Sequence, residues 1–159
     1  MGAITIIETI AVDCPAHHAW AIVADYERDP AWRRGVATMA PHPNGPVGVG
    51  TTTAEELRFA GQTRRNAGEV TAVEPGRSFR WRTVEGDDAA GSRTVEPVDA
   101  DHCRVTLELV VRPHGVEAIL GPVLGPMLRR TVRGDLARLR ELATAVTTGR
   151  GGGTNRRRS

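Results

Sequence analysis

The stretch MLRRTVRGDLARLRELATAV, residues Met127 to Val146, lies near the end of the 159-residue chain and governs how the rest is arranged. Its apolar residues recur mostly at steps of three and four, which predicts one long amphipathic helix. Two Gly-Pro pairs, at 121–122 and 125–126, predict a bend or break upstream of it. The predicted apolar stripe consists of Val116, Leu120, Val123, Leu124, Met127, Leu128, Val132, Leu136, Leu139, Ala143 and Val146.

A second informative stretch, AVDCPAHHAWAIVADYERDPAW (residues 11–32), places two short helices directly after a first strand. Residues 3–12 are rich in β-branched types and predict that strand. Pro15 suits the first position of a helix, because no backbone N–H group is needed there. Pro30 limits the second short helix, which we expect over about residues 26–32.

Between these helical regions the sequence consists of short strand-like segments separated by turns. The turns carry Asn-Gly, Ala-Gly and Pro-Gly pairs, which favour tight reversals of the chain. Strands at such close spacing predict an antiparallel sheet in which neighbours in sequence pair with one another. The six strands predicted here span residues 36–40, 51–59, 62–74, 78–84, 91–98 and 103–112.

Alternation predicts that this sheet has one apolar and one charged face. In the last strand Leu107 and Leu109 fall on one side, and Arg104 and Glu108 on the other. An apolar face must be covered, and the C-terminal helix is the available cover. The sequence therefore predicts an α+β fold, with a seven-stranded antiparallel sheet curved around a long C-terminal helix.

Composition favours one domain in a reducing compartment. Cys14 and Cys103 are far apart in sequence and lack a metal-binding spacing, so we expect free thiols. The apolar N-terminal stretch has no basic residue before it and is interrupted by Glu8, unlike a signal peptide. No apolar run approaches the roughly 20 residues of a spanning helix. We expect a cytoplasmic protein without stable membrane insertion.

The formal net charge of +2 comes from the C-terminal end of the chain. Residues 147–159 are rich in Gly and Arg, with four arginines and no acidic residue, so the remainder is slightly acidic. A segment without apolar residues cannot pack, and we expect a disordered tail; a partner contact through this tail is the other interpretation. Aromatic residues make up only 4% of the chain, which disfavours a nucleic-acid partner.

The order of one strand, two short helices, six strands and one long helix resembles the START-like superfamily, also called the Bet v 1-like or helix-grip (SRPBCC) fold. Within it, the chain is similar to the bacterial polyketide cyclase/dehydrase and lipid-transport type. The resemblance covers about residues 3–146, which we expect to form one domain. It rests on AVDCP (11–15), AW (19–20), AD (24–25), PAW (30–32), VGT (49–51), EV (69–70), EPGR (74–77), FRW (79–81), RVT (104–106) and DLARL (135–139).

This resemblance implies an internal cavity that binds a hydrophobic small molecule, such as a lipid, an isoprenoid or a polyketide. The alternative that it implies is a polyketide aromatase/cyclase or dehydratase that uses acid/base residues of the same cavity. The fold hosts many unrelated functions, so whether the protein is an enzyme stays open. We expect no cofactor and no metal ion, and either a monomer or a homodimer.

Counting by twos along the strands predicts that polar side chains also face the cavity: Glu55, Arg64, Asn66 and Arg93. Because a buried charge is costly unless it is paired, Glu55 should meet an arginine. If the protein is an enzyme, Glu55 and Arg93 are the candidates for proton transfer. A shift of the strand register by one residue would instead turn these side chains toward water.

The remaining expected ligand contacts are mostly apolar. Tyr26 and Trp32 lie on the short helices that form the cavity mouth in similar proteins, and their alternative role is core packing. No nucleophile, metal or phosphate-binding motif accompanies them. The full set of expected ligand-binding residues is Tyr26, Trp32, Leu57, Phe59, Arg64, Asn66, Phe79, Trp81, Leu107, Leu109, Leu120, Leu124 and Leu128.

Overall fold

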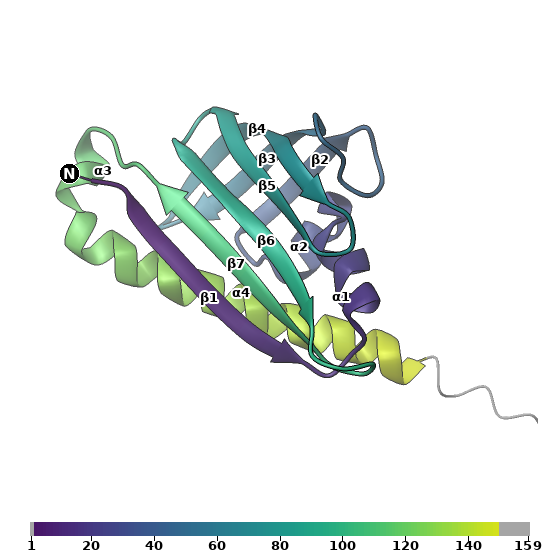
Figure 1. Cartoon of the computed structure of the whole chain (residues 1–159). Helices are drawn as coiled ribbons and strands as arrows, with labels where there is room; N and C mark the ends of the chain where they lie inside the picture. Colours follow the sequence, from purple (N-terminus) through teal and green to yellow (C-terminus); the bar gives the residue numbers. More distant parts are fainter. Residues whose placement is uncertain (1, 150–159) are drawn as a thin grey trace, which may run out of the picture.

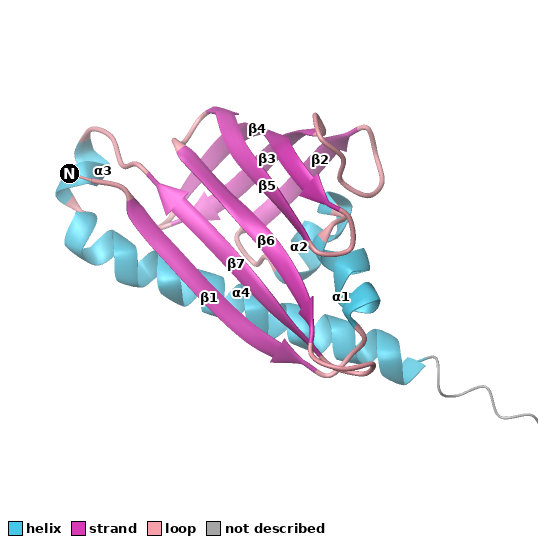
Figure 2. Ribbon diagram, in the orientation of Figure 1, coloured by secondary structure: helices cyan, strands magenta, loops and turns pink. Residues whose placement is uncertain are grey.

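A computed structural model describes residues 2–149, apart from the side chains of residues 116 and 146–149. Its seven strands form one antiparallel sheet in the order β1-β7-β6-β5-β4-β3-β2, and a long helix crosses one face of it (Figure 1, Figure 2). The strands are β1 (Ile4–Val12), β2 (Val36–His42), β3 (Thr52–Phe59), β4 (Gln62–Glu74), β5 (Ser78–Glu85), β6 (Ala89–Pro97) and β7 (Cys103–Val111).

The helices occur at two places in the sequence, after β1 and after β7. Three short ones follow β1: α1 (Ala16–Val23), the 3-10 turn η1 (Tyr26–Arg28) and α2 (Asp29–Trp32). Two more follow β7, namely α3 (Val116–Ile119) and the long α4 (Gly121–Gly149). The predicted fold class, a helix-grip arrangement of sheet and C-terminal helix, is confirmed.

The long helix differs from its prediction at both ends. The expected break falls between α3 and α4, and α4 then continues through Pro126 rather than stopping at it. At the other end α4 extends to Gly149, so residues 147–149 are helical, whereas the sequence predicts that the tail begins at residue 147. The rest of that predicted tail, residues 150–159, lies outside the described residues.

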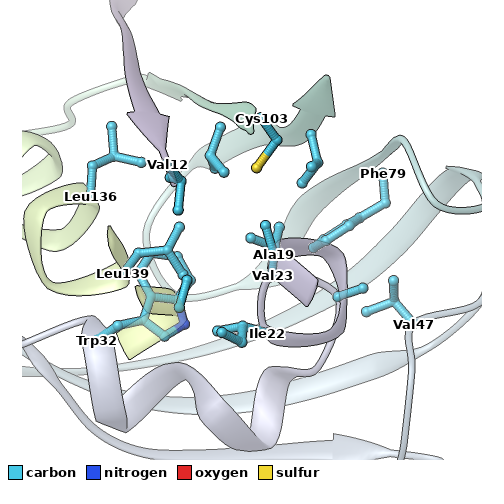
Figure 3. Packing of buried hydrophobic residues seen from close by; sticks show 14 of the residues in the cluster. Val12, Ala19, Ile22, Val23, Trp32, Val47, Phe79, Cys103, Leu136 and Leu139 are labelled. Carbon is cyan, nitrogen blue, oxygen red and sulfur yellow. The ribbon is translucent and has the colours of Figure 1, made fainter. Parts of the chain in front are cut away.

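The hydrophobic core occupies only one half of the space between sheet and helix. Leu136 and Leu139 of α4 pack with Val12 of β1 and with Ala19 and Val23 of α1 (Figure 3). All five side chains are at most 2% exposed. Burial of this kind is the main force that holds the helix on the sheet.

The half of α4 closer to α3 is packed much less closely. Val123 is 57% exposed and Met127 is 38% exposed, although both belong to the predicted apolar stripe. Leu124 and Leu128 are only half-buried. The same helix is thus solidly packed at one end and leaves space beneath it at the other.

A close approach between strands shapes the wall of that space. Gly91 of β6 lies opposite Trp81 of β5 in the strand register. A Cβ atom at position 91 would lie 2.2 Å from the carbonyl oxygen of Glu108 and 2.7 Å from Cζ2 of Trp81. The absence of a side chain at this position therefore allows the indole ring to lie across the sheet.

Replacing Gly91 with Ala should destabilise the protein by about 1–3 kcal/mol, because the backbone carbonyl of Glu108 cannot move away without disturbing the β6–β7 pairing. Urea unfolding followed by tryptophan fluorescence measures the change. The matched control is Gly134→Ala in α4, where the nearest heavy atom lies 3.7 Å away and alanine favours the helix. Equal stability of the two variants would contradict this account of the wall.

Candidate ligand-binding cavity

A cavity of about 660 Å³ lies between the sheet and the loosely packed half of α4. Its walls come from β3 to β7, from α2 and the residues after it, and from the α3–α4 segment. The volume falls within the range of about 300–1,000 Å³ that is typical of small-molecule sites. The apolar part of the wall consists mainly of Leu57, Phe59, Trp81, Leu107, Leu109, Val111, Leu120, Leu124, Leu128 and Val132.

Most of the residues expected at a ligand lie on this wall, and whether they contact a ligand stays a prediction. The polar ones, Glu55, Arg64, Asn66 and Arg93, also contribute to it, so the predicted strand register holds here. The expected ligand-binding residues that line the cavity are Trp32, Leu57, Phe59, Arg64, Asn66, Trp81, Leu107, Leu109, Leu120, Leu124 and Leu128.

Tyr26 and Phe79 do not line this cavity, and their contact with a ligand stays a prediction. Their side chains are 5% and 1% exposed, and their rings meet edge to face with centroids 5.7 Å apart. Both are core residues that join η1 to β5. Burial raises the pKa of Tyr26 to about 12, so its hydroxyl group stays protonated.

Tyr26 instead borders a second, much smaller hollow. This space of about 40 Å³ is also lined by polar side chains, including Arg33, Glu55 and Arg93. A volume of this size has room for water, because one bound water needs only about 10–15 Å³. The short helices thus form the inner wall of the site, and Trp32, which is fully buried, does not stand at an open mouth.

An ion network centred on Asp29 closes the end of the large cavity nearer α2. The Asp29 carboxylate is fully buried and accepts from both terminal nitrogens of Arg93, at 2.8 and 2.6 Å. It also accepts from Nη1 of Arg33 at 2.9 Å. Burial by itself would raise the pKa of Asp29, but the two neighbouring guanidinium groups hold that pKa below its ordinary value.

Glu55 has the arginine partner that its burial called for. Nη2 of Arg33 donates to Oε1 of Glu55 at 3.2 Å. Arg93, the other proposed catalytic residue, is committed elsewhere: its guanidinium group binds Asp29 and lies 4.8 Å from the ring centroid of Tyr26. Arg93 therefore positions the network, whereas Glu55 keeps one carboxylate oxygen, Oε2, without a hydrogen bond from any described residue.

Asp135 of α4, like Arg33, is a site residue that sequence reasoning missed. Its side chain lines the cavity and is 8% exposed. Oδ1 accepts from the backbone N–H of Arg34 at 3.3 Å and from Nη2 of Arg138 at 2.7 Å. Burial raises the pKa of this carboxyl group in spite of Arg33 and Arg138. The sequence does hold a signal, since Asp135 follows Val132 by three residues and so lies on the apolar stripe.

A separate polar cluster lies at the end of the cavity nearer α3. Nη1 of Arg64 donates to Asp87 in the β5–β6 turn at 2.5 Å, and Nη2 binds Glu117 of α3. These contacts tie β4, the turn and α3 together. The lining residues Ala60, Arg112, His114 and Leu120 at this end are exposed, so the cavity opens to solvent here.

The described residues contain neither a metal site nor an activated cysteine nucleophile. No group of three or more His, Cys, Asp or Glu side chains among them is arranged to hold a metal ion. Cys14 and Cys103 are buried, and burial raises the pKa of both thiols, that of Cys103 to about 12, so neither is an activated nucleophile. Within residues 2–149 no helix is both long and apolar enough to cross a membrane.

Several solved structures share this fold. The Zhui aromatase/cyclase from Streptomyces sp. R1128 superposes with a TM-score of 0.77 and 16% identity, over 90% of this chain and 94% of that one. A START superfamily protein from Mycobacterium smegmatis gives a TM-score of 0.74 and 17% identity, over 91% and 99% of the two chains. At these identities the likeness shows the fold.

A relative in sequence and a family model extend the comparison. An uncharacterized 17.2 kDa protein from Streptomyces lincolnensis is 28% identical over 135 residues, which is 84% of this chain and 85% of that protein. The family described as polyketide cyclase/dehydrase and lipid transport matches residues 3–147, nearly the whole of the described chain. The protein thus belongs to the polyketide cyclase/dehydrase and lipid transport family.

Proposed function

We propose that the protein binds a hydrophobic small molecule, such as a lipid, an isoprenoid or a polyketide, in the cavity between its sheet and α4. The observation that carries this proposal is the cavity of about 660 Å³ with leucine-rich walls in a protein whose other half is closely packed. Apolar ligand surface buried there contributes about 25 cal/mol per Å² to binding.

The surroundings of the open end support the same proposal. Ile119 is 78% exposed and Leu120 is 55% exposed, and Leu120 also lines the cavity. An apolar surface that runs from the outside into the cavity offers an entering molecule continuous apolar contact. Entry at the α3 end would bring a ligand past Leu124 and Leu128 toward α2.

Filling the cavity should weaken binding. Leu109 of β7 lines the cavity, and a tryptophan at this position would occupy the space that a ligand needs. We expect Leu109→Trp to weaken binding of the apolar dye N-phenyl-1-naphthylamine at least about tenfold, a loss of about 1.4 kcal/mol or more. The enhancement of dye fluorescence in a titration measures the affinity.

The next residue along the same strand provides the control. Val110 points to the opposite face of the sheet and does not line the cavity, so Val110→Trp should bind the dye as the unmodified protein does. Full dye affinity in Leu109→Trp, or an equal loss in both variants, would show that the dye does not bind in this space.

A catalytic role as a polyketide aromatase/cyclase is the second candidate. It is supported by a carboxylate with a free oxygen, Oε2 of Glu55, inside an apolar cavity, and by the shared fold of the Zhui aromatase/cyclase. In this role Glu55 would take a proton from a methylene group between two ketones. The resulting carbanion would attack another ketone carbon, and the new alkoxide would receive the proton back.

The catalytic candidate predicts that Glu55→Gln lowers the turnover of a soluble poly-β-ketone by about a hundredfold or more, because glutamine cannot accept the proton. The measurement is the rate of cyclised product formation by liquid chromatography. The control, Glu56→Gln, alters the neighbouring side chain, which binds Arg65 instead. Unchanged turnover in Glu55→Gln would remove Glu55 from the reaction, and no turnover in the unmodified protein would leave ligand binding as the function.

A further inference from the structure

We infer that the polar end of the ligand is an uncharged hydrogen-bond donor, a hydroxyl group, which donates its one hydrogen bond to a free carboxylate oxygen of Glu55 or of Asp135. The inference extends to specificity: a molecule of the same shape that ends in a carboxylate is rejected. It rests on the proposed function and assigns the chemical class of the ligand at the α2 end of the cavity.

Two carboxylate oxygens at this end lack a partner. Both hydrogen bonds of Asp135 reach Oδ1, and the one bond of Glu55 reaches Oε1, so among the described residues nothing donates to Oδ2 or Oε2. Neither oxygen belongs to the side-chain atoms that are both fully buried and without a partner. Both oxygens therefore retain accessible surface. Ionised carboxylate oxygens only accept hydrogen bonds, and a ligand group that meets them must therefore donate.

The arginines near these oxygens are already engaged. Arg93 gives both terminal nitrogens to Asp29, and Arg33 gives one to Asp29 and one to Glu55. The negative charge of Asp135 also stabilises the protonated form of Arg33 by raising its pKa. Arg138 gives Nη2 to Asp135 and Nε to the carbonyl oxygen of Trp32. Three carboxylates are thus matched by three arginines that are already engaged, and a ligand carboxylate would be a fourth acid without an arginine of its own in this network.

The wall of the cavity as a whole carries more acidic than basic residues. Six acidic residues and four arginines contribute to it, and the acidic residues remain in excess when Glu108, which pairs with Arg80, is left out. Burial raises the pKa of Asp135, so the neighbouring arginines do not fully offset the cost of burying its negative charge. Burying a further anion among these groups is unfavourable.

The apolar wall sets the direction of the rest of the ligand. Along α4, Asp135 lies eleven residues after Leu124, which is about 16 Å at 1.5 Å per residue. Leu124 and Leu128 line the cavity on the helix side, and Leu107 and Leu109 line it on the sheet side. A hydroxyl group held at Asp135 therefore leaves an apolar chain to run between these leucines toward α3.

The test compares three unbranched probes at pH 8: decan-1-ol, its methyl ether and decanoate. Their alkyl chains are of nearly the same length, and they differ in carrying a neutral donor, a neutral acceptor without a donor, and an anion. Displacement of N-phenyl-1-naphthylamine gives each affinity. We expect decan-1-ol to bind at least about tenfold more tightly than decanoate, because the alcohol donates a hydrogen bond to a charged group, whereas burial of a further anion is unfavourable. We expect the ether to bind several-fold more weakly than the alcohol.

A double variant, Glu55→Gln with Asp135→Asn, assigns this preference to the two carboxyl groups. Each amide keeps the shape of the side chain but can turn an N–H donor toward the ligand and removes one negative charge. The ratio of alcohol to decanoate affinity should fall at least about tenfold in this variant. The matched control is Glu56→Gln with Glu141→Gln, which changes two side chains outside the cavity wall on the same two elements.

The outcomes separate this inference from the function on which it rests. Decanoate or the ether binding as tightly as the alcohol in the unmodified protein would overturn the hydroxyl preference and leave a hydrophobic-ligand site in place. Failure of the dye and all three probes to bind would overturn both. A preference that is equal in the unmodified protein and in the folded double variant would show that Glu55 and Asp135 do not set it. If the double variant does not fold, each single substitution should lower the ratio in the same direction.

Discussion

The buried ion pair between Asp29 and Arg93 is the constraint on which the site depends. It joins the first residue of α2 to the middle of β6, two elements that are 64 residues apart in sequence. Because both charges are almost fully buried, removing one would leave the other uncompensated, at a cost of about 3–5 kcal/mol. Asp29 also accepts a hydrogen bond from Arg33, which directly follows α2, and Arg33 in turn donates to Glu55. The position of α2 and the orientation of the cavity's polar side chains therefore follow from one interaction.

The long helix connects the packed core to the open cavity. Leu136, Leu139 and Ala143 anchor its C-terminal half against the core, whereas Leu124 and Leu128 face space. A helix anchored along one half can cover a hollow without filling it, since close packing in proteins is continuous only where side chains meet. Arg64, which binds Asp87 and Glu117, adds a polar link at the far end. The same residues that stabilise the fold thus leave room for a ligand.

Alternation and helical periodicity were sufficient to predict the fold and most of the cavity wall, because both reflect which side of an element faces the interior. The register placed Glu55 and Arg64 on the inner face, as found. Sequence patterns do not show which inward residues meet each other across the fold. They therefore do not show that Tyr26 and Phe79, two expected ligand contacts, pack against one another. Arg33 and Asp135 were missed for the same reason, since their roles depend on α2 meeting α4.

Xenon tests most directly whether the space between β7 and α4 is accessible to apolar molecules. Xenon enters dry apolar cavities in folded proteins without needing a specific polar contact. Crystals of the protein pressurised with xenon should show a strong site between Leu109 and Leu124. Diffraction data in which that region is filled by side chains, with no xenon between the two leucines, would contradict the account.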